Sequence, residues 1–261
     1  MGMCVLLTLS YAEWLAHFGQ RTTYLTDFVV TKDRIQHSIF VSFLVMILLH
    51  ARDVWPRART ACYVLITVAV VNLLFMVHSR TGYLVLGSLI TLYLVERLRV
   101  RGLIYATSLI VAVGIAGYAT SSGVRDRVQQ TGLQIQDQFL SSTRHAPDPK
   151  WDPRMQFIAY SSRMIARHPW IGTGTGSFAQ IFEHDSNNLA ALSLLPAEPH
   201  NEFLLITAQL GFVGLGLFVW LFAAQWRASH RLPLAEARLS RGLVLTVALS
   251  CLFNSMLLGF T

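Results

Sequence analysis

The chain concentrates its apolar residues in long uncharged runs. Crossing a bilayer as a helix takes about 20 apolar residues, with a range near 17–25. The runs that approach or exceed this length are 35–51, 60–77, 81–95, 102–123, 203–226 and 242–261. The run 35–51 is marginal, and 81–95 is short unless Arg80 and Arg97 snorkel from its two ends. With residues 1–18 as a further possible span, the pattern predicts an all-α fold, a polytopic transmembrane helical bundle.

Composition agrees with this class of fold. The chain is 53% hydrophobic and only 13% charged, with a mean hydropathy of +0.47, whereas about 25% of the residues of a soluble domain are charged. An ordinary soluble domain is therefore excluded. Cys4, Cys62 and Cys251 fall in separate apolar runs, which favours small buried side chains over a disulfide or a metal site.

Arginines gather in one set of short loops, which fixes the predicted orientation. The loop arginines are Arg52, Arg57, Arg59, Arg97, Arg99, Arg101, Arg227, Arg231, Arg238 and Arg241. Only Asp53, Glu96 and Glu236 oppose them, so the positive-inside rule makes these loops cytoplasmic. Residues 19–34, 78–80 and 121–202 then lie outside. The net charge of +7 follows from this topology, so we expect a lipid bilayer and no nucleic acid as partner.

The spans and loops predict three regions: transmembrane helices with short loops over 1–120, one large and partly helical periplasmic loop over 121–202, and transmembrane helices over 203–261. Because the chain ends inside an apolar run, we also expect a piece of a longer protein.

Within the outer loop, residues 124–142 read as largely helical and 144–153 as irregular. Asp152-Pro153-Arg154 is typical of a helix start, and this helix should run to about His168, where Pro169 stops it. Residues 171–178 predict a glycine turn and 182–199 an irregular segment. The apolar face expected for the helix is Met155, Ile158, Ala159, Ser162, Ile165 and Ala166.

Three polar residues are candidates for chemistry at the outer surface. Arg80 begins an apolar run, where an arginine is costly unless it meets an anion or water; a snorkelling anchor is the alternative. Arg154 starts the loop helix and could equally be solvated or paired with Asp152. His200 opens the run from 203, where a near-neutral imidazole suits general-base work, although a merely structural histidine fits too. Asn201 beside it could orient a sugar or a phosphate.

Two other motifs are rejected. The stretch from Gly172 to Gly176 alternates glycine with threonine as a nucleotide loop does, but no strand precedes it and no Lys-Ser/Thr follows. A tight turn that returns the chain to the membrane is favoured. Glu183-His184-Asp185 has metal-binding side chains, yet three adjacent residues do not point at one centre. We therefore predict neither a metal nor a cofactor.

Three motifs in one order resemble the O-antigen ligase family. They are Ser79-Arg80-Thr81-Gly82 at a span start; Arg154, followed by a helix and His168-Pro169-Trp170-Ile171-Gly172-Thr173-Gly174; and His200-Asn201, nine residues before Gly211-Phe212-Val213-Gly214. The resemblance runs from about 60 to 261. Members of that family have more spans than this chain, so it resembles the C-terminal part of one.

The resemblance implies an activity and roles for the matching residues. The family moves a glycan from undecaprenyl diphosphate to an acceptor at the periplasmic face of the bacterial inner membrane, without metal or nucleotide. Arg80 and Arg154 match its arginine positions, where bidentate guanidinium groups bind the diphosphate. His200 matches its histidine, the base for the acceptor hydroxyl. A direct displacement would invert the anomeric carbon and needs no carboxylate pair.

Several functions stay open at this point. An O-antigen ligase, with lipid A–core as acceptor, is the leading interpretation. An O-antigen polymerase, whose acceptor is another lipid-linked repeat, and a protein O-oligosaccharyltransferase share the membrane domain. A transporter of the lipid-linked glycan is the non-enzyme alternative, but transporters bind near the bilayer midplane, whereas these polar candidates lie at the outer surface.

Overall fold

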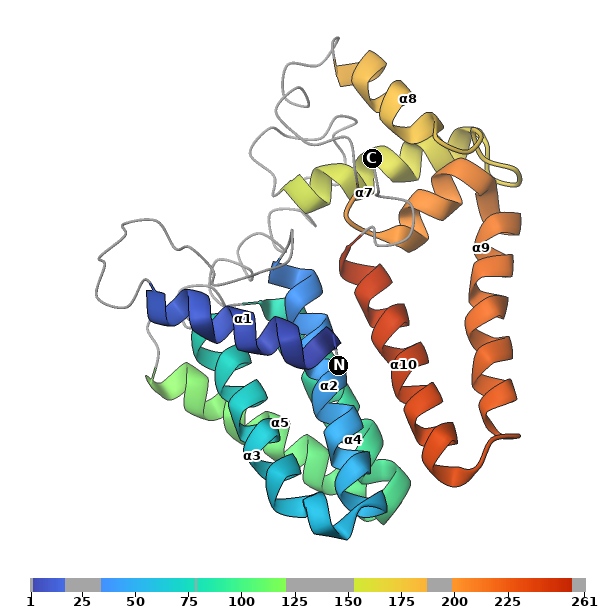
Figure 1. Cartoon of the computed structure of the whole chain (residues 1–261). Helices are drawn as coiled ribbons and strands as arrows, with labels where there is room; N and C mark the ends of the chain where they lie inside the picture. Colours follow the sequence, from blue (N-terminus) through green and yellow to red (C-terminus); the bar gives the residue numbers. More distant parts are fainter. Residues whose placement is uncertain (1, 17–33, 78, 121–152, 187–198, 255–261) are drawn as a thin grey trace. The chain divides into compact units, whose positions relative to one another are not determined.

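The computed structural model describes residues 2–16, 34–77, 79–120, 153–186 and 199–254, and all regular elements in them are helices (Figure 1). This confirms the predicted all-α fold. The chain divides into two compact units, each considered by itself. Unit 1 is Met1–Ser108 with Ala223–Ser250, and unit 2 is Leu109–Phe222 with Cys251–Thr261. The predicted helix over 124–142 and the irregular stretch 144–152 lie outside the described residues.

Four helical segments of the described chain are long and apolar enough to cross a bilayer. They are Arg34–Val54, Pro56–Met76, Arg80–Leu98 and Glu202–Ser229, which correspond to the predicted runs at 35–51, 60–77, 81–95 and 203–226. The runs at 102–123 and 242–261 contribute to two further helices, α5 (Val100–Thr120) and α10 (Leu234–Phe253). Residues 1–18 include α1 (Gly2–Ala16).

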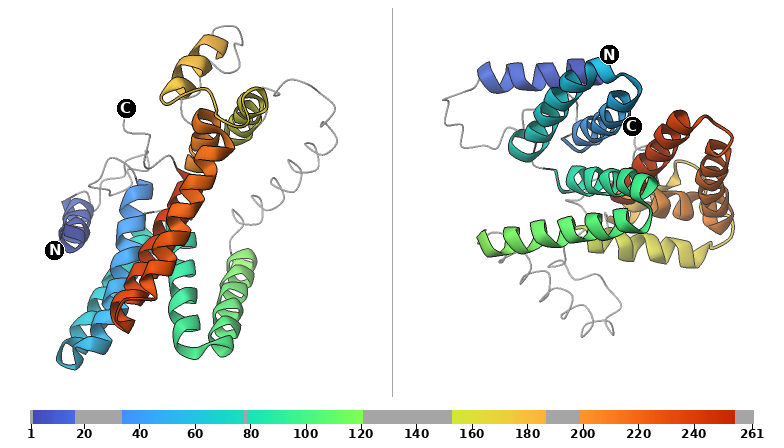
Figure 2. Two further views of the ribbon diagram at one scale, coloured as in Figure 1. Left: turned by 90° about the vertical axis from the view of Figure 1, so that its right-hand side faces the viewer. Right: turned by 90° about the horizontal axis from the view of Figure 1, so that it is seen from below.

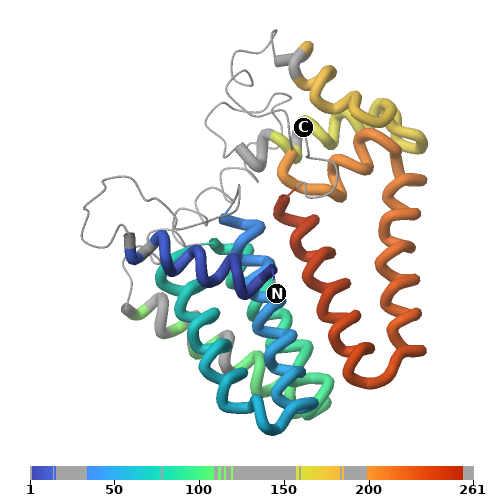
Figure 3. The backbone as a smooth tube through the Cα atoms, in the orientation of Figure 1, coloured from blue at the N-terminus to red at the C-terminus, as the bar shows by residue number. Residues whose placement is uncertain are grey.

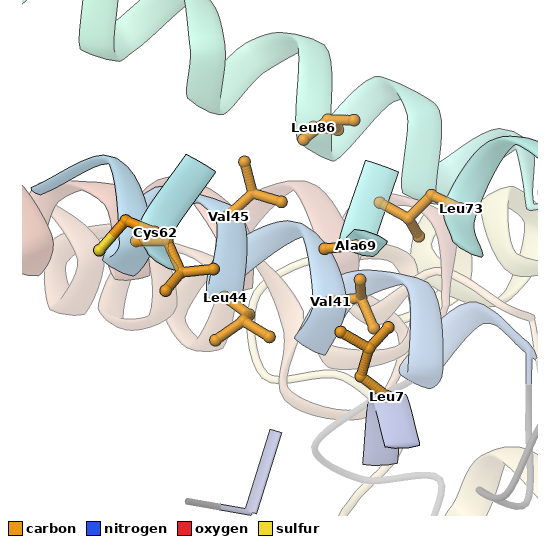
Figure 4. Close-up of a cluster of buried hydrophobic side chains, with 9 residues drawn as sticks. Leu7, Val41, Leu44, Val45, Cys62, Ala69, Leu73 and Leu86 are labelled. Atoms are coloured by element: carbon orange, nitrogen blue, oxygen red, sulfur yellow. The ribbon is translucent and has the colours of Figure 1, made fainter. Parts of the chain in front are cut away.

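Unit 1 is built around α2 (Arg34–Val54), which packs against α3 (Arg59–Val71) and α4 (Arg80–Leu98). Apolar side chains from α1 to α4 form one buried cluster (Figure 4). Small residues let α2 and α4 approach closely, as is common between membrane helices: a Cβ at Gly82 would collide with Ser38, and the Ser42 hydroxyl donates to the Gly82 carbonyl over 3.3 Å. This packing holds the first turn of α4.

The arginine-rich end of unit 1 is tied together by ion pairs. Glu96, near the end of α4, accepts a hydrogen bond of 2.6 Å from Arg241 of α10 and lies 3.7 Å from Arg238. Arg97 pairs with Asp53 of α2. Two of the three predicted cytoplasmic acids are thus engaged by arginines of other helices. Figure 2 shows the tight turn by which α4 leads into α5 at this end.

Unit 2 centres on a helix pair and the first part of α9 (Glu202–Ser229). The pair is α7 (Pro153–Arg167) and α8 (Ser177–Ser186). The predicted helix start at Pro153 and its end before Pro169 are confirmed. The core of this unit consists of Phe157, Tyr160, Met164, Phe178, Phe182, Leu205 and Ala208.

Two sequence predictions for unit 2 are wrong. The buried face of α7 carries Phe157, Tyr160, Ser161 and Met164, while Ile158, Ser162 and Ala166 of the predicted face are exposed. The helical period was right and its phase was not, because the aromatic rings at 157 and 160 bury more area than the small residues assigned to the core. Residues 182–186, predicted irregular, form the end of α8, where Phe182 is fully buried.

Candidate functional site

Helix α9 is broken at Gly211. This residue has φ 65° and ψ −167°, a region that essentially only glycine occupies. The nine residues before it form a short arm that turns sideways from the rest of the helix, as the backbone tube shows (Figure 3). In a straight helix the Phe212 and Val213 N–H groups would donate to the carbonyls of Ala208 and Gln209. The break leaves these four groups without their helical partners.

The loop after α7 supplies all four missing partners. Phe212 N donates to Pro169 O over 2.7 Å and Val213 N to Trp170 O over 3.3 Å. In return, Ala208 O accepts from Thr173 N over 3.1 Å and Gln209 O from Gly174 N over 2.8 Å. We call this exchange between residues 169–174 and 208–213 the clasp. Because buried backbone groups must be paired, the clasp permits the break.

Close backbone contact makes glycine necessary on both sides of the clasp. A Cβ at Gly211 would collide with the Trp170 carbonyl, and one at Gly172, whose φ is 73°, would collide with the backbone of Gln209. The Thr173 hydroxyl adds a bond of 3.1 Å to Ala208 O and contacts the Ser177 hydroxyl at 2.7 Å. The predicted glycine turn is therefore confirmed as a turn, and its function in the fold is to bind the broken helix.

His200 lies at the N-terminal end of the short arm of α9. Its φ of 49° places it in the left-handed region, where histidine is more common than most residues. The half-buried ring stands edge-on to Phe157 of α7, with centroids 6.0 Å apart and planes at 87°. The imidazole is thus held by an apolar contact on one side while part of it stays accessible.

Asn201 caps the arm that follows His200. Its carboxamide oxygen accepts from Leu204 N over 3.1 Å, and its backbone carbonyl accepts from Leu205 N over 3.0 Å. This is the usual work of an N-cap asparagine. The expected role of Asn201 in substrate binding stays a prediction. Its amide nitrogen would make that contact, because its carboxamide oxygen already accepts a hydrogen bond from the helix.

Arg154 occupies the first turn of α7, three residues before Phe157. Positions three apart lie on one side of a helix, so position 154 is on the same side of α7 as Phe157, which contacts His200. The arginine side chain itself lies outside the described residues. The competing arginines, Arg163 and Arg167, are exposed further along α7.

Sequence reasoning missed two polar residues of unit 2. The Ser161 hydroxyl, one turn after Phe157, is fully buried, and it has no hydrogen-bond partner among the described residues. Glu202, two residues after His200, is also fully buried in the first turn of α9, where an acid is favoured by the helix dipole. The position of Glu202 next to His200-Asn201 was the only feature of the sequence that could have pointed to it.

Arg80 belongs to unit 1, where it is the first residue of α4 and is exposed. The Ser79 side chain caps this helix by accepting from Gly82 N over 3.2 Å. A positive charge in the first turn opposes the helix dipole, so Arg80 does not stabilise α4 locally. The guanidinium group and the helix N-terminus together favour a bound anion.

A buried polar network supports the segment before Arg80. Residues Asn72–Met76 form a π-helix turn, a feature often found at functional sites. The Asn72 carboxamide is 3.1 Å from His37 Nε2 and donates to the Ser10 hydroxyl over 3.0 Å, and all three residues are fully buried. Hydrogen bonds between helices hold membrane bundles together, so this network fixes the end of the helix that leads to Arg80.

The rejected metal motif is part of α8. Glu183, His184 and Asp185 are consecutive residues of this helix, and consecutive positions of a helix do not share a face. Across the described residues, no three His, Cys, Asp or Glu side chains gather as a metal site would require.

Comparison with known proteins adds one match. The family model of the O-antigen ligases matches residues 65–219, more than half of the chain. This range includes Arg80, Arg154, His200 and both sides of the clasp. No curated protein matches the chain.

Proposed function

We propose, because the chain belongs to the O-antigen ligase family, that it transfers an O-antigen glycan from undecaprenyl diphosphate to lipid A–core at the periplasmic face of the bacterial inner membrane. The family is one of membrane enzymes of the ligase and polymerase type. Lipid-linked glycans and a membrane setting follow from the family and from the apolar helices. The donor, the acceptor and the side of the membrane are our proposal.

The observation that carries this proposal is the position of His200. A half-buried imidazole lies at the end of the α9 arm, edge-on to Phe157 on the helix that starts with Arg154. In this arrangement His200 removes the proton of the acceptor hydroxyl as that oxygen attacks the anomeric carbon. Arg154 binds the diphosphate leaving group, and the attack from the opposite side inverts the anomeric configuration.

Arg80 also binds the diphosphate in this proposal. Its guanidinium group and the capped N-terminus of α4 are both favourable to phosphate oxygens. The bond between the anomeric carbon and the diphosphate breaks with both electrons on the phosphate oxygen. Arginine side chains stabilise this developing charge most where water is excluded.

Replacing Arg80 or Arg154 by alanine is expected to abolish most donor use. Lysine should restore only part of it, because it keeps the charge but loses the bidentate fork. The measurement is glycan transfer in purified full-length enzyme against donor concentration. Arg167→Ala, on the exposed end of α7, is the matched control and should behave as wild type. Full activity of Arg80→Lys would show that a point charge is sufficient.

Activity is expected to survive EDTA, because two arginines take over the charge neutralisation that a divalent ion performs in other phosphate chemistry. Transfer by the purified full-length protein should be unchanged after chelation and dialysis. Loss of activity that Mg²⁺ or Mn²⁺ restores would contradict the metal-independent mechanism. His184→Gln would then test whether the rejected motif of α8 is the metal site.

The lipopolysaccharide of a deletion strain distinguishes the activities. If the chain is a ligase, deletion removes all O-antigen from lipid A–core while the lipid-linked polymer persists. Core carrying a single repeat indicates a polymerase instead, and normal lipopolysaccharide with unglycosylated protein indicates a protein O-oligosaccharyltransferase. Failure of the lipid-linked glycan to reach the periplasm indicates a transporter. Complementation with His200→Ala separates catalysis from loss of the protein.

A further inference from the structure

Burial along α9 changes abruptly at the break. Leu205, Ile206, Thr207, Ala208 and Gln209 are all buried, and Leu205 and Ala208 belong to the core formed with α7 and α8. The arm before Gly211 is therefore largely covered by protein, with Leu210, 37% exposed, as the exception. Its burial sets it apart from a helix surrounded by lipid.

After the break, α9 carries an exposed apolar surface. Phe212 is 48% and Val213 57% exposed, and the large apolar side chains of Leu217, Val219 and Trp220 are exposed further along. Residues 212–226, which end before Arg227, cover about 22 Å at the helical rise of about 1.5 Å per residue. The hydrocarbon core of a bilayer is about 30 Å thick, and Arg227 can snorkel to the headgroups from the cytoplasmic end, as Arg80 and Arg97 do for the short run 81–95. With this extension the span needs no contribution from the arm.

The clasp places two further apolar side chains beside the start of this span. Trp170 is 70% and Ile171 80% exposed, although both belong to a loop fixed by hydrogen bonds. The ring of Trp170 stands against that of Phe212, with centroids 6.3 Å apart. Trp170, Ile171, Phe212 and Val213 together form what we call the anchor patch. Through Phe212 and Val213 it joins the exposed apolar surface of α9.

We propose that the anchor patch lies at the headgroup level of the bilayer and that the hydrocarbon span of α9 begins at Phe212. Tryptophan prefers this level because its ring is apolar and its N–H is polar. The exposed Arg167 and His168, just before the patch, are polar groups of the kind that flank membrane spans.

One consequence concerns the depth of His200. With the patch at the headgroups, the arm of α9 lies outside the hydrocarbon, and His200 at its N-terminal end is held at the membrane surface by its contact with Phe157. The clasp thereby sets the height of α7, α8 and the arm relative to the bilayer surface. This inference rests on the membrane setting and not on the proposed chemistry, so each can fail without the other.

Depth-dependent quenching tests the proposal in the full-length protein reconstituted into vesicles. Cysteine replaces Ile171, Leu217 or Gln180 one at a time, in a Cys4→Ala background where Cys62 and Cys251 are buried. Each cysteine then carries an environment-sensitive fluorophore. The label at 171 should be quenched most by lipids with a spin label near the headgroup, and the label at 217 by spin labels deep in the chains. Gln180, exposed on α8, is the control and should respond to aqueous iodide.

Two results would overturn the proposal. Iodide quenching at 171 as strong as at 180 would place the patch in water. Quenching at 171 with the depth profile of 217 would place it in the hydrocarbon and move the span boundary into the arm. As a second measurement, the emission of Trp170 is obtained as the difference between the wild-type and Trp170→Phe spectra. Lipids brominated near the headgroup should quench this emission. If transfer activity is normal and either contrary result is found, the position of the anchor patch is rejected and the proposed chemistry is not.

Discussion

Replacing His200 by alanine is expected to lower turnover by about 10²- to 10⁴-fold, the usual contribution of a general base. Donor binding should remain largely intact, because the diphosphate is assigned to the arginines. The measurement is single-turnover transfer together with donor affinity, in purified full-length enzyme. His184→Gln, an exposed histidine in the same unit, is the control and should retain wild-type rates.

Two substitutions separate proton transfer from hydrogen bonding at this position. Asparagine tolerates the left-handed backbone at 200, and glutamine keeps a neutral acceptor on a longer side chain. Neither takes up a proton near neutral pH, so both should be as slow as alanine if His200 is the base. Near-wild-type turnover in His200→Gln would instead assign the residue a hydrogen bond to phosphate, and the family would be unaffected.

The pH profile supplies an independent check of the same role. A general base acts in its unprotonated form, which acid removes. The wild-type rate should therefore fall on the acid side, with the residual rate of His200→Gln independent of pH over that range. An acid limb that persists in the variant would assign the titration to another group.

The second large effect is expected for Gly211→Ala. Alanine at φ 65° and ψ −167° costs about 1–3 kcal/mol in strain, and its Cβ collides with the Trp170 carbonyl. Relief of the collision opens the clasp, where each hydrogen bond contributes about 1 kcal/mol. We therefore expect a destabilisation of unit 2 of about 3 kcal/mol or more, measured as lower thermal stability in detergent and faster proteolysis.

Gly216 offers a matched control in the same helix. It is exposed and a Cβ there meets open space, so Gly216→Ala should be neutral or slightly stabilising. Gly172→Ala should resemble Gly211→Ala, and the double variant should be less destabilised than the two effects added, because both open the same clasp. Equal melting of Gly211→Ala and Gly216→Ala would show that the clasp does not hold the unit.

The sequence by itself determined the class of fold and the local elements. Uncharged runs of sufficient length form helices in a bilayer, because a helix pairs all its backbone groups within one segment. Pro153 and Pro169 bound α7 because proline suits a first turn and cannot extend a helix. The motifs around Arg80, Arg154 and His200 identified the family, since each is a short stretch readable without its surroundings.

Only the tertiary structure decided how these stretches meet. The face of α7 depended on which side chains Phe178 and Leu205 could cover, and that contact is not visible in a helical period. The clasp joins Pro169–Gly174 to Ala208–Val213 by hydrogen bonds of the backbone, whose partners no side-chain pattern records. Glycines at 172 and 211 signalled unusual backbone at each place. The two glycines come together because the four backbone groups left without helical partners at the break in α9 bind the loop after α7. This contact also sets the position of His200.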